Sequence, residues 1–401
     1  MSRCAVSQAE TPSGTVAVSA PSARSRWHGL GLALLGGSLL LAGCERTDTV
    51  QRGYRGLALT QLYKPSRIAA SAEINQIPEP EEAADPDSPL ASEVFKNVQI
   101  LKDVKATEFS RLMQALSTWV APEEGCDFCH NPNKLESDEK YTKVVARRML
   151  QMTRQINTEW KPHVANTGVT CWTCHRGQAV PSGDWFTAAA PKAAPASLGN
   201  HAGKNMPAAN AGNSALPYDP MSVFLTGDDN DVRIQGMAPL ASISANRHTV
   251  KQAEWTYSLM MYMSNSLGVN CTYCHNTRAM GRWEESTPQR ATAWHGIRMV
   301  RSLNSNFLTP LTPLFPAHRL GPLGDGPKIG CATCHKGAFK PLYGVSPLKD
   351  YPILGPTIQA ALPAAAAPAA QAASAGTAGT ADKLALLTPA LADYPPGPGR
   401  P

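Results

Sequence analysis

Four copies of the pattern Cys-x-x-Cys-His are the residues of this chain best suited to do chemistry. Two thiols separated by two residues can reach the two vinyl groups on one edge of a porphyrin and form thioethers, and the next histidine then lies under the iron as its proximal ligand. Four copies in one chain predict four covalently bound c-type haems. Their residues are Cys126, Cys129 and His130, then Cys171, Cys174 and His175, then Cys271, Cys274 and His275, and last Cys331, Cys334 and His335.

Two other uses of paired cysteines fit the pattern less well. A zinc site built from two Cys-x-x-Cys pairs needs no histidine directly after each pair, and a redox dithiol does not need four copies. Haem iron is therefore the expected metal.

Each haem that only carries electrons also needs a sixth ligand from the protein, because an open position admits oxygen, peroxide or nitrite. Met113 and Met149 lie on apolar faces of expected helices, thirteen and twenty-two residues before their motifs. In the third unit Met260 is favoured and Met263 comes second, since Met261 shares its face with polar residues. Methionine also fills gaps in cores, so these are candidates.

The fourth motif has no such obvious partner. Met299 corresponds to Met149 in sequence order, but it stands thirty-two residues before Cys331, and three prolines would break a continuing helix. His318 lies thirteen residues before Cys331 in a Pro-rich stretch. His163 lies in the other half of the chain and has no evident local role.

Helical periodicity precedes three of the motifs. Apolar residues repeat at helical spacing over 109–120 and over 141–156, where Ser137 is a plausible N-cap, and Thr249 with Gln252 forms a capping-box pattern. Strand-like alternation is sparse. The predicted fold class is mainly α with much irregular chain, a multihaem cytochrome c.

The motif-bearing units also repeat in the order A, B, A′, B′. Arg111-Leu112-Met113 before the first motif resembles Ser258-Leu259-Met260 before the third, and Arg148-Met149-Leu150 resembles Arg298-Met299-Val300. This order predicts a pseudo-twofold duplicated pair of helix-plus-motif units. The expected segments are an extended N-terminal segment 44–90, a first dihaem half 91–187, an Ala/Pro/Gly-rich mobile linker 188–217, a second dihaem half 218–355 and a disordered Ala/Pro-rich tail 356–401.

The N-terminus reads as a targeting segment. Thirteen mostly apolar residues, 29–41, are too few to span a bilayer and have the length of a signal-peptide core. They end in Leu41-Ala42-Gly43-Cys44, which resembles a bacterial lipobox. We expect a lipoprotein signal peptide over 1–43 and lipidation of Cys44. An uncleaved anchor helix is the alternative, and both place the body of the protein outside the cytoplasm at a membrane surface.

Composition limits the partners. The chain has 37 basic and 31 acidic residues, a net charge of +6, and no long basic run, so no nucleic acid is expected. The segment 121–140 is nevertheless acidic, with net charge −4, which predicts that a basic soluble donor docks beside the first haem. Its charged residues are Glu123, Glu124, Asp127, Glu136, Asp138 and Glu139 against Lys134 and Lys140.

Several of these stretches reveal a family resemblance. The run 141–163, with Val144-Val145-Ala146-Arg147-Arg148-Met149-Leu150, closely resembles the tetrahaem cytochrome c subunit of purple-bacterial photosynthetic reaction centres. Over residues 50–355 the likeness also includes Gly168-Val169-Thr170-Cys171, Ser286-Thr287-Pro288-Gln289-Arg290, Val94-Phe95-Lys96-Asn97-Val98 and Gly53-Tyr54-Arg55-Gly56.

The resemblance implies a function in photosynthetic electron transport. The subunit would be lipid-anchored on the periplasmic face of the inner photosynthetic membrane and bound to the core membrane subunits that carry bacteriochlorophyll. Its four haems would relay electrons from a soluble periplasmic donor, a small cytochrome c or a high-potential iron–sulfur protein, to the photo-oxidised special pair.

The resemblance also assigns residues. It makes Met113, Met149 and Met260 the sixth ligands of the first three haems and His163 that of the fourth. It places the third haem nearest the special pair, and it implies that Arg290 raises that haem's potential, because a cation favours the reduced, less positive iron centre.

Two other functions compete with this one. A free-standing periplasmic multihaem electron-transfer lipoprotein would carry the same haem motifs. A multihaem reductase or peroxidase would need a haem without a sixth ligand, and four candidate sixth ligands argue against an enzyme. The motifs outside the haem sites favour the reaction-centre subunit.

Overall fold

A computed structural model describes residues 45–51, 60–189, 207–227, 231–234 and 249–355. The predicted signal peptide, Cys44, the stretch Gly53-Tyr54-Arg55-Gly56, most of the linker and the C-terminal tail lie outside the described residues.

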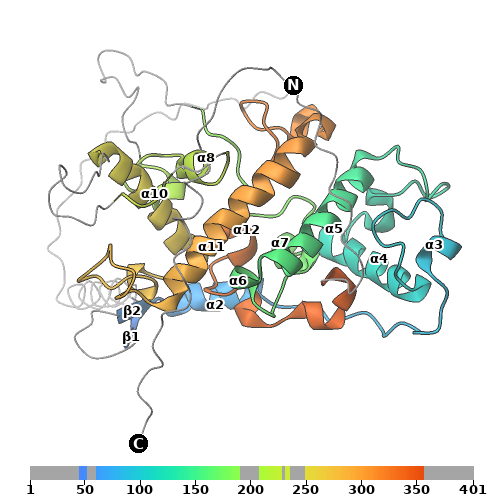
Figure 1. Ribbon diagram of the computed structural model, residues 1–401, viewed down its shortest axis with the longest axis horizontal. Helices are drawn as coiled ribbons and strands as arrows, with labels where there is room; N and C mark the ends of the chain where they lie inside the picture. The colour runs from blue at the N-terminus through green and yellow to red at the C-terminus, as the bar shows by residue number, and fades with distance from the viewer. Residues whose placement is uncertain (1–44, 52–59, 190–206, 228–230, 235–248, 356–401) are drawn as a thin grey trace, which may run out of the picture. The chain divides into compact units, whose positions relative to one another are not determined.

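The described part of the chain is mostly helical with much irregular chain, as predicted (Figure 1). Four helices are long: α4 (Ala106–Val120), α5 (Tyr141–Glu159), α10 (Val250–Leu267) and α11 (Pro288–Leu303). The shorter helices are α2 (Pro65–Ile74), α3 (Ala91–Val94), α6 (Lys161–Val164), α7 (Cys171–His175), α8 (Pro220–Phe224) and α12 (Cys331–His335).

Short turns of 3-10 helix complete the fold. They are η1 (Gly125–Phe128), η3 (Ala209–Ala211), η4 (Cys271–Tyr273), η6 (Thr309–Leu314), η7 (Ala317–Arg319), η8 (Pro341–Gly344), η9 (Pro347–Asp350) and η10 (Pro352–Leu354), and a π-helical turn, η5 (Asn304–Leu308), continues α11.

The ends of the long helices follow from local chemistry, with one correction. Thr249 Oγ1 accepts from the backbone N–H of Gln252 at 3.3 Å and Gln252 Oε1 accepts from that of Thr249 at 2.7 Å, so the predicted capping box is confirmed. The prediction of Ser137 as N-cap of the second helix is wrong. Helix α5 begins after Lys140, and the Ser137 carbonyl instead accepts from the ammonium of Lys143 at 2.8 Å.

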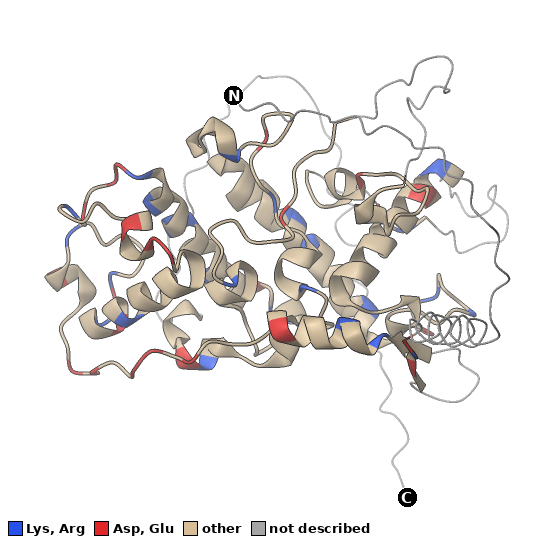
Figure 2. Ribbon diagram, turned by 180° about the vertical axis from the view of Figure 1, so that it is seen from behind, with Lys and Arg blue, Asp and Glu red and all other residues tan. Residues whose placement is uncertain are grey.

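The N-terminal segment contains more structure than expected. Strands β1 (Asp48–Gln51) and β2 (Thr60–Tyr63) form an antiparallel pair in which Asp48 lies opposite Tyr63. The prediction of an extended segment over 44–90 is wrong for residues 65–74, which form α2. Residues 78–82 have no regular structure, and Figure 2 shows acidic residues, coloured red on the ribbon, along the loop between α2 and α3.

The end of the predicted mobile linker is packed. Ala211 in η3 is fully buried, and a Cβ on Gly212 would lie 2.9 Å from the terminal methyl of Met261 in α10. Small residues are therefore needed here because they let the chain approach the helix closely. Residues 207–217 belong with the second half of the chain.

Two apolar clusters hold the helices together. One combines the second half of α5 with α8, α10 and α11, and includes Leu259, Leu303 and Met299. The other joins α4, α5 and α7 to the C-terminal turns through Leu112, Trp119 and Leu354. Burying each of these leucine side chains stabilises the folded state by about 1.5–3 kcal/mol relative to leaving it exposed. In the part of the chain that the structure describes, none of the helices is both long and apolar enough to cross a membrane.

Candidate haem-binding sites

The four Cys-x-x-Cys-His motifs adopt two alternating geometries. The first and third lie on the 3-10 turns η1 and η4, whereas the second and fourth form the short helices α7 and α12. After these two helices, Arg176 and Lys336 adopt left-handed backbone conformations with φ of 51° and 46°. All eight motif cysteines are free thiols. Pairs of free thiols next to a histidine are the donor set that covalent haem attachment needs.

Each motif histidine is held in one orientation by its own backbone loop. The Nδ1 atoms lie at hydrogen-bonding distance from the carbonyls of Leu135 (His130, 2.9 Å), Gln178 (His175, 2.8 Å), Met280 (His275, 3.0 Å) and Ala338 (His335, 2.9 Å). A carbonyl can only accept, so Nδ1 carries the proton and the Nε2 lone pair stays available for a metal. Metal-bound histidines are oriented in this way in proteins.

His163 carries the same signature, although it belongs to no motif. Its Nδ1 lies 2.9 Å from the Thr292 carbonyl, and its ring centre lies 6.1 Å from that of His335. A metal–imidazole bond of about 2.0 Å, with about 1.1 Å from ring nitrogen to ring centre, separates two trans imidazoles by about 6.2 Å. The spacing of His163 and His335 therefore fits two ligands on opposite sides of one iron.

Burial keeps both rings neutral. It lowers the pKa of His163, and burial together with the neighbouring His163 lowers the pKa of His335 to about 4. Neutral imidazole is the form that binds a metal. Among the other candidates, His318 is exposed on η7 and Met299 is buried in the core.

A glycine makes room for His163. A Cβ on Gly296 of α11 would lie 2.6 Å from Cε1 and 2.9 Å from Nδ1 of the ring. The imidazole therefore rests directly on the helix backbone, within reach of the Thr292 carbonyl one turn earlier.

The candidate methionines are distributed over both apolar clusters. Met113 is partly buried against the cluster of α4, α5 and α7. Met149, Met260 and Met263 are partly buried against the other cluster, whereas Met261 is packed over Gly212. The structure thus separates Met261 from the other two methionines of α10, as the polar face of Met261 predicts.

Two buried asparagines position the second and fourth motifs, and sequence reasoning missed them. Asn157 accepts from the N–H of Val169 at 2.7 Å and donates to its carbonyl at 2.9 Å, two residues before Cys171. Asn304 makes the same pair of bonds, at 2.9 Å each, with Ile329, two residues before Cys331. The signal was an asparagine near the end of each preceding helix.

The first and third motifs share a different pair of contacts. Asn131 and Asn276, each directly after the motif histidine, accept from the backbone N–H two residues later and donate to a glutamate. Thr142 and Thr287, at the starts of α5 and α11, donate to the carbonyl between the two cysteines. The local structure therefore recurs in alternate motifs.

Contacts link the motifs in the series first, second, fourth, third. The N–H of Gly177, after the second motif, donates to Trp119 of α4 at 2.9 Å, just before the first motif. The thiols of Cys174 and Cys334 are neighbours, and their interaction raises the pKa of Cys174 and lowers that of Cys334. The N–H of Gly337, after the fourth motif, donates to Ser266 of α10 at 2.9 Å, just before the third.

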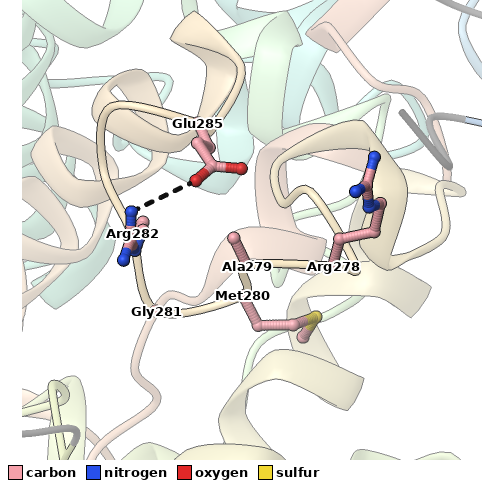
Figure 3. Close-up of a pocket in the computed structure, with 6 residues that line it drawn as sticks. All are labelled: Arg278, Ala279, Met280, Gly281, Arg282 and Glu285. Carbon is pink, nitrogen blue, oxygen red and sulfur yellow. Dashed lines mark ion pairs between the residues drawn. The ribbon is translucent and has the colours of Figure 1, made fainter. Parts of the chain in front are cut away.

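The third motif is enclosed by the N-terminal hairpin and by an arginine. Thr60 of β2 accepts from Asn270 Nδ2 at 3.0 Å and from the Thr272 hydroxyl. Arg290 Nη1 donates to the carbonyl of Arg282 at 2.8 Å, and its guanidinium stacks on Trp283. The loop that Arg290 contacts follows His275 and lines a cavity of about 570 Å³. Figure 3 shows this lining, which includes Met280 and the ion pair of Arg282 and Glu285.

A helical chain with Cys-x-x-Cys-His motifs, in which the Nε2 atoms of the motif histidines are available to bind iron, has the features of a c-type cytochrome. The family model of the photosynthetic reaction centre cytochrome c subunit matches residues 43–355. Two curated proteins of that name are similar to this chain. The one from Rubrivivax gelatinosus is 52% identical over 82% of this chain and 88% of the relative, and the one from Thermochromatium tepidum is 48% identical over 82% of this chain and 81% of the relative. A third, from Roseobacter denitrificans, is 38% identical and covers 82% of this chain and 91% of the relative.

The chain therefore belongs to the family of photosynthetic reaction centre cytochrome c subunits. Membership implies covalently bound haem and association with the reaction centre.

The contact of His163 with Gly296 gives a stability test. Alanine is normally favoured over glycine inside a helix by about 1 kcal/mol. Here we expect Gly296→Ala to lower the free energy of unfolding by about 1 kcal/mol, because the overpacking against a hydrogen-bonded ring costs about 1–3 kcal/mol. Denaturant midpoints followed by circular dichroism measure this. In a His163→Ala background the same change should stabilise, and a stabilising Gly296→Ala in the parent chain would contradict the contact.

Proposed function

We propose that this chain binds four c-type haems and relays electrons through them from a soluble periplasmic donor to the photo-oxidised special pair of the reaction centre. The observation that carries the proposal is the contact series that joins all four motifs. Electron transfer between cofactors requires them to be close neighbours. In that series the segments that flank successive motifs are hydrogen-bonded to each other, and the second and fourth motifs meet through Cys174 and Cys334.

The proposed ligands follow from the site residues. Cys126, Cys129, Cys171, Cys174, Cys271, Cys274, Cys331 and Cys334 attach the haems, and His130, His175, His275 and His335 are the proximal ligands. Met113, Met149 and Met260 are the proposed sixth ligands of the first three irons. His163 is the proposed sixth ligand of the fourth, supported by its 6.1 Å spacing from His335 and by its hydrogen bond to Thr292.

The proposed electron path enters at the first motif and leaves at the third. The second and fourth motifs occupy the middle of the contact series, so the first and third are its ends. The family resemblance favours the third haem as the one nearest the special pair. Arg290 is the proposed residue that raises its potential, supported by its hydrogen bond from α11 to the loop that follows His275.

We also infer a duplication of the chain. The hydrogen bonds of Asn157 and Asn304 before the second and fourth motifs support it, as do those of Thr142 and Thr287 at the first and third. The proposed ligation by His163 departs from this repeat. His163 belongs to the first half, whereas the repeat alone would assign Met299 to the fourth motif.

The proposed location is the periplasmic face of the photosynthetic membrane, with acyl chains on Cys44. The lipobox-like end of the apolar run supports this. Intact-mass analysis of protein extracted from membranes should give a chain that starts at Cys44 and carries acyl chains, and a chain starting at Met1 would contradict it.

Flash spectroscopy tests the function. In membranes, a short flash should bleach the special pair, and its recovery should coincide with oxidation of a haem of this chain, because the chain is its electron donor. A chain whose haems stay reduced while the special pair recovers would instead be a free-standing carrier.

Changing His163→Met tests the fourth ligand. Methionine raises haem potential relative to histidine, so a redox titration should show a higher potential for one haem only. Electron paramagnetic resonance should at the same time lose the signal of a bis-histidine low-spin haem. Persistence of that signal in the variant would rule out His163.

The acidic surface near the first motif tests the entry point. Glu123 and Glu124 are exposed, but Asp138 is paired with Lys143 and Arg147, so the surface is less negative than the count over 121–140 suggests. We expect the triple change of Glu123, Glu124 and Glu136 to lysine to slow association of a basic donor at low salt, because electrostatic steering is lost. Stopped-flow kinetics measure this rate.

The matched control changes three exposed glutamates elsewhere, Glu73, Glu159 and Glu284, to lysine. It alters the net charge by the same amount and should slow association much less. Equal rates for the two triple variants would mean that the donor responds only to net charge and does not dock at the first motif.

A further inference from the structure

A buried lysine touches the loop that holds the first motif histidine. Lys143, in the first turn of α5, is 8% exposed. Its ammonium donates to the carbonyls of Leu135 at 2.9 Å and Ser137 at 2.8 Å, and lies 3.2 Å from Asp138 Oδ1. These three partners use the three donors of the ammonium, so its position is fixed.

The carbonyl of Leu135 serves two donors. It accepts from Lys143 and also from Nδ1 of His130, both at 2.9 Å. The other three motif histidines donate in the same way to the carbonyls of Gln178, Met280 and Ala338. The first motif thus has a direct link between a charged side chain and the acceptor of its histidine.

We propose that Lys143 is a positioning residue that raises the reduction potential of the first haem through the Leu135 carbonyl. The proposal rests on the proposed haem-binding function. A carbonyl that already accepts from an ammonium is a weaker acceptor for the Nδ1–H of His130. The imidazole then has less anionic character and donates less electron density to the iron, which favours the reduced state.

The charge of Lys143 acts in the same direction. A fixed cation close to the proximal histidine disfavours the oxidised, more positive iron centre. Asp138 offsets part of this charge, but it also accepts from Arg147 at 2.9 Å and is exposed, whereas Lys143 is buried. Lys143, Arg147 and Asp138 together therefore carry a net positive charge. Lys143 is the most buried of the three, and it is the one that donates to the loop after His130.

The third unit offers a comparison. Arg290 is the third residue of α11, as Lys143 is the third residue of α5, and each donates to carbonyls of the loop after its motif histidine. Arg290 bonds to Arg282, not to Met280, whose carbonyl holds His275. The cation of the first unit is thus one hydrogen bond closer to its histidine.

Redox titration of the full haem-loaded chain tests the proposal. We expect Lys143→Met to lower the equilibrium constant for reduction of one haem about tenfold, which is about 59 mV for a one-electron couple. The variant Met113→His identifies this haem as the first one, because Met113 is its proposed sixth ligand and the same potential should move in both variants. Lys134→Met, which removes an exposed lysine next to Leu135, is the matched control and should leave all four potentials in place.

Two further variants separate a tuning role from a structural one. Asp138→Asn removes the counter-charge and should raise the potential of the same haem, and Lys143→Arg keeps the charge and should restore most of the parent value. Unchanged potentials in Lys143→Met, or a uniform shift of all four haems, would overturn the proposal. If Lys143→Met does not fold, the sign of the Asp138→Asn shift decides. The titration needs no reaction centre, so its failure leaves the flash experiment independent.

Discussion

The hydrogen bond from a histidine Nδ1 to a backbone carbonyl is the interaction on which the rest of this structure depends. It fixes both the tautomer and the plane of the ring. The acceptor is a backbone carbonyl, which can only accept and whose position is set by the fold. Five histidines of the described residues have it, four in the motifs and His163 outside them. The surrounding helices can be understood as the means of holding those five carbonyls in place.

Two solutions to that task alternate along the chain. At the second and fourth motifs the acceptor lies three residues after the histidine, and a buried asparagine fixes the strand of chain before the motif. At the first and third motifs the acceptor lies five residues after it, and the longer loop is closed by Asn131 or Asn276. The longer loops expose more backbone carbonyls, and these carbonyls are what Lys143 and Arg290 bind. Loop length therefore decides where a cation can approach a histidine.

Packing of the two halves against each other creates the remaining site. Asn157 bonds at once to the chain before the second motif and to Leu354 at the C-terminal end of the fold, and His163 follows six residues later. The absence of a side chain at Gly296 then lets His163 approach α11 closely enough to donate to Thr292 and to face His335. A single methyl group at that glycine would occupy the space of the ring.

The sequence by itself determined the candidate attachment residues, three of the four long helices and the family, because these are written in contiguous patterns. The patterns are the Cys-x-x-Cys-His motifs, the apolar periodicity before Cys126 and Cys171, and the capping box at Thr249. The family resemblance implied that His163 pairs with His335, but no local pattern records this, and the tertiary structure is what brings residues 163 and 335 together. It also decided that the carboxylate of Asp138 is neutralised by Lys143 and Arg147, and that Leu135 is shared between a lysine and a histidine. Counting charges along a segment cannot find such pairs, since electrostatic energy depends on distances in space and on burial.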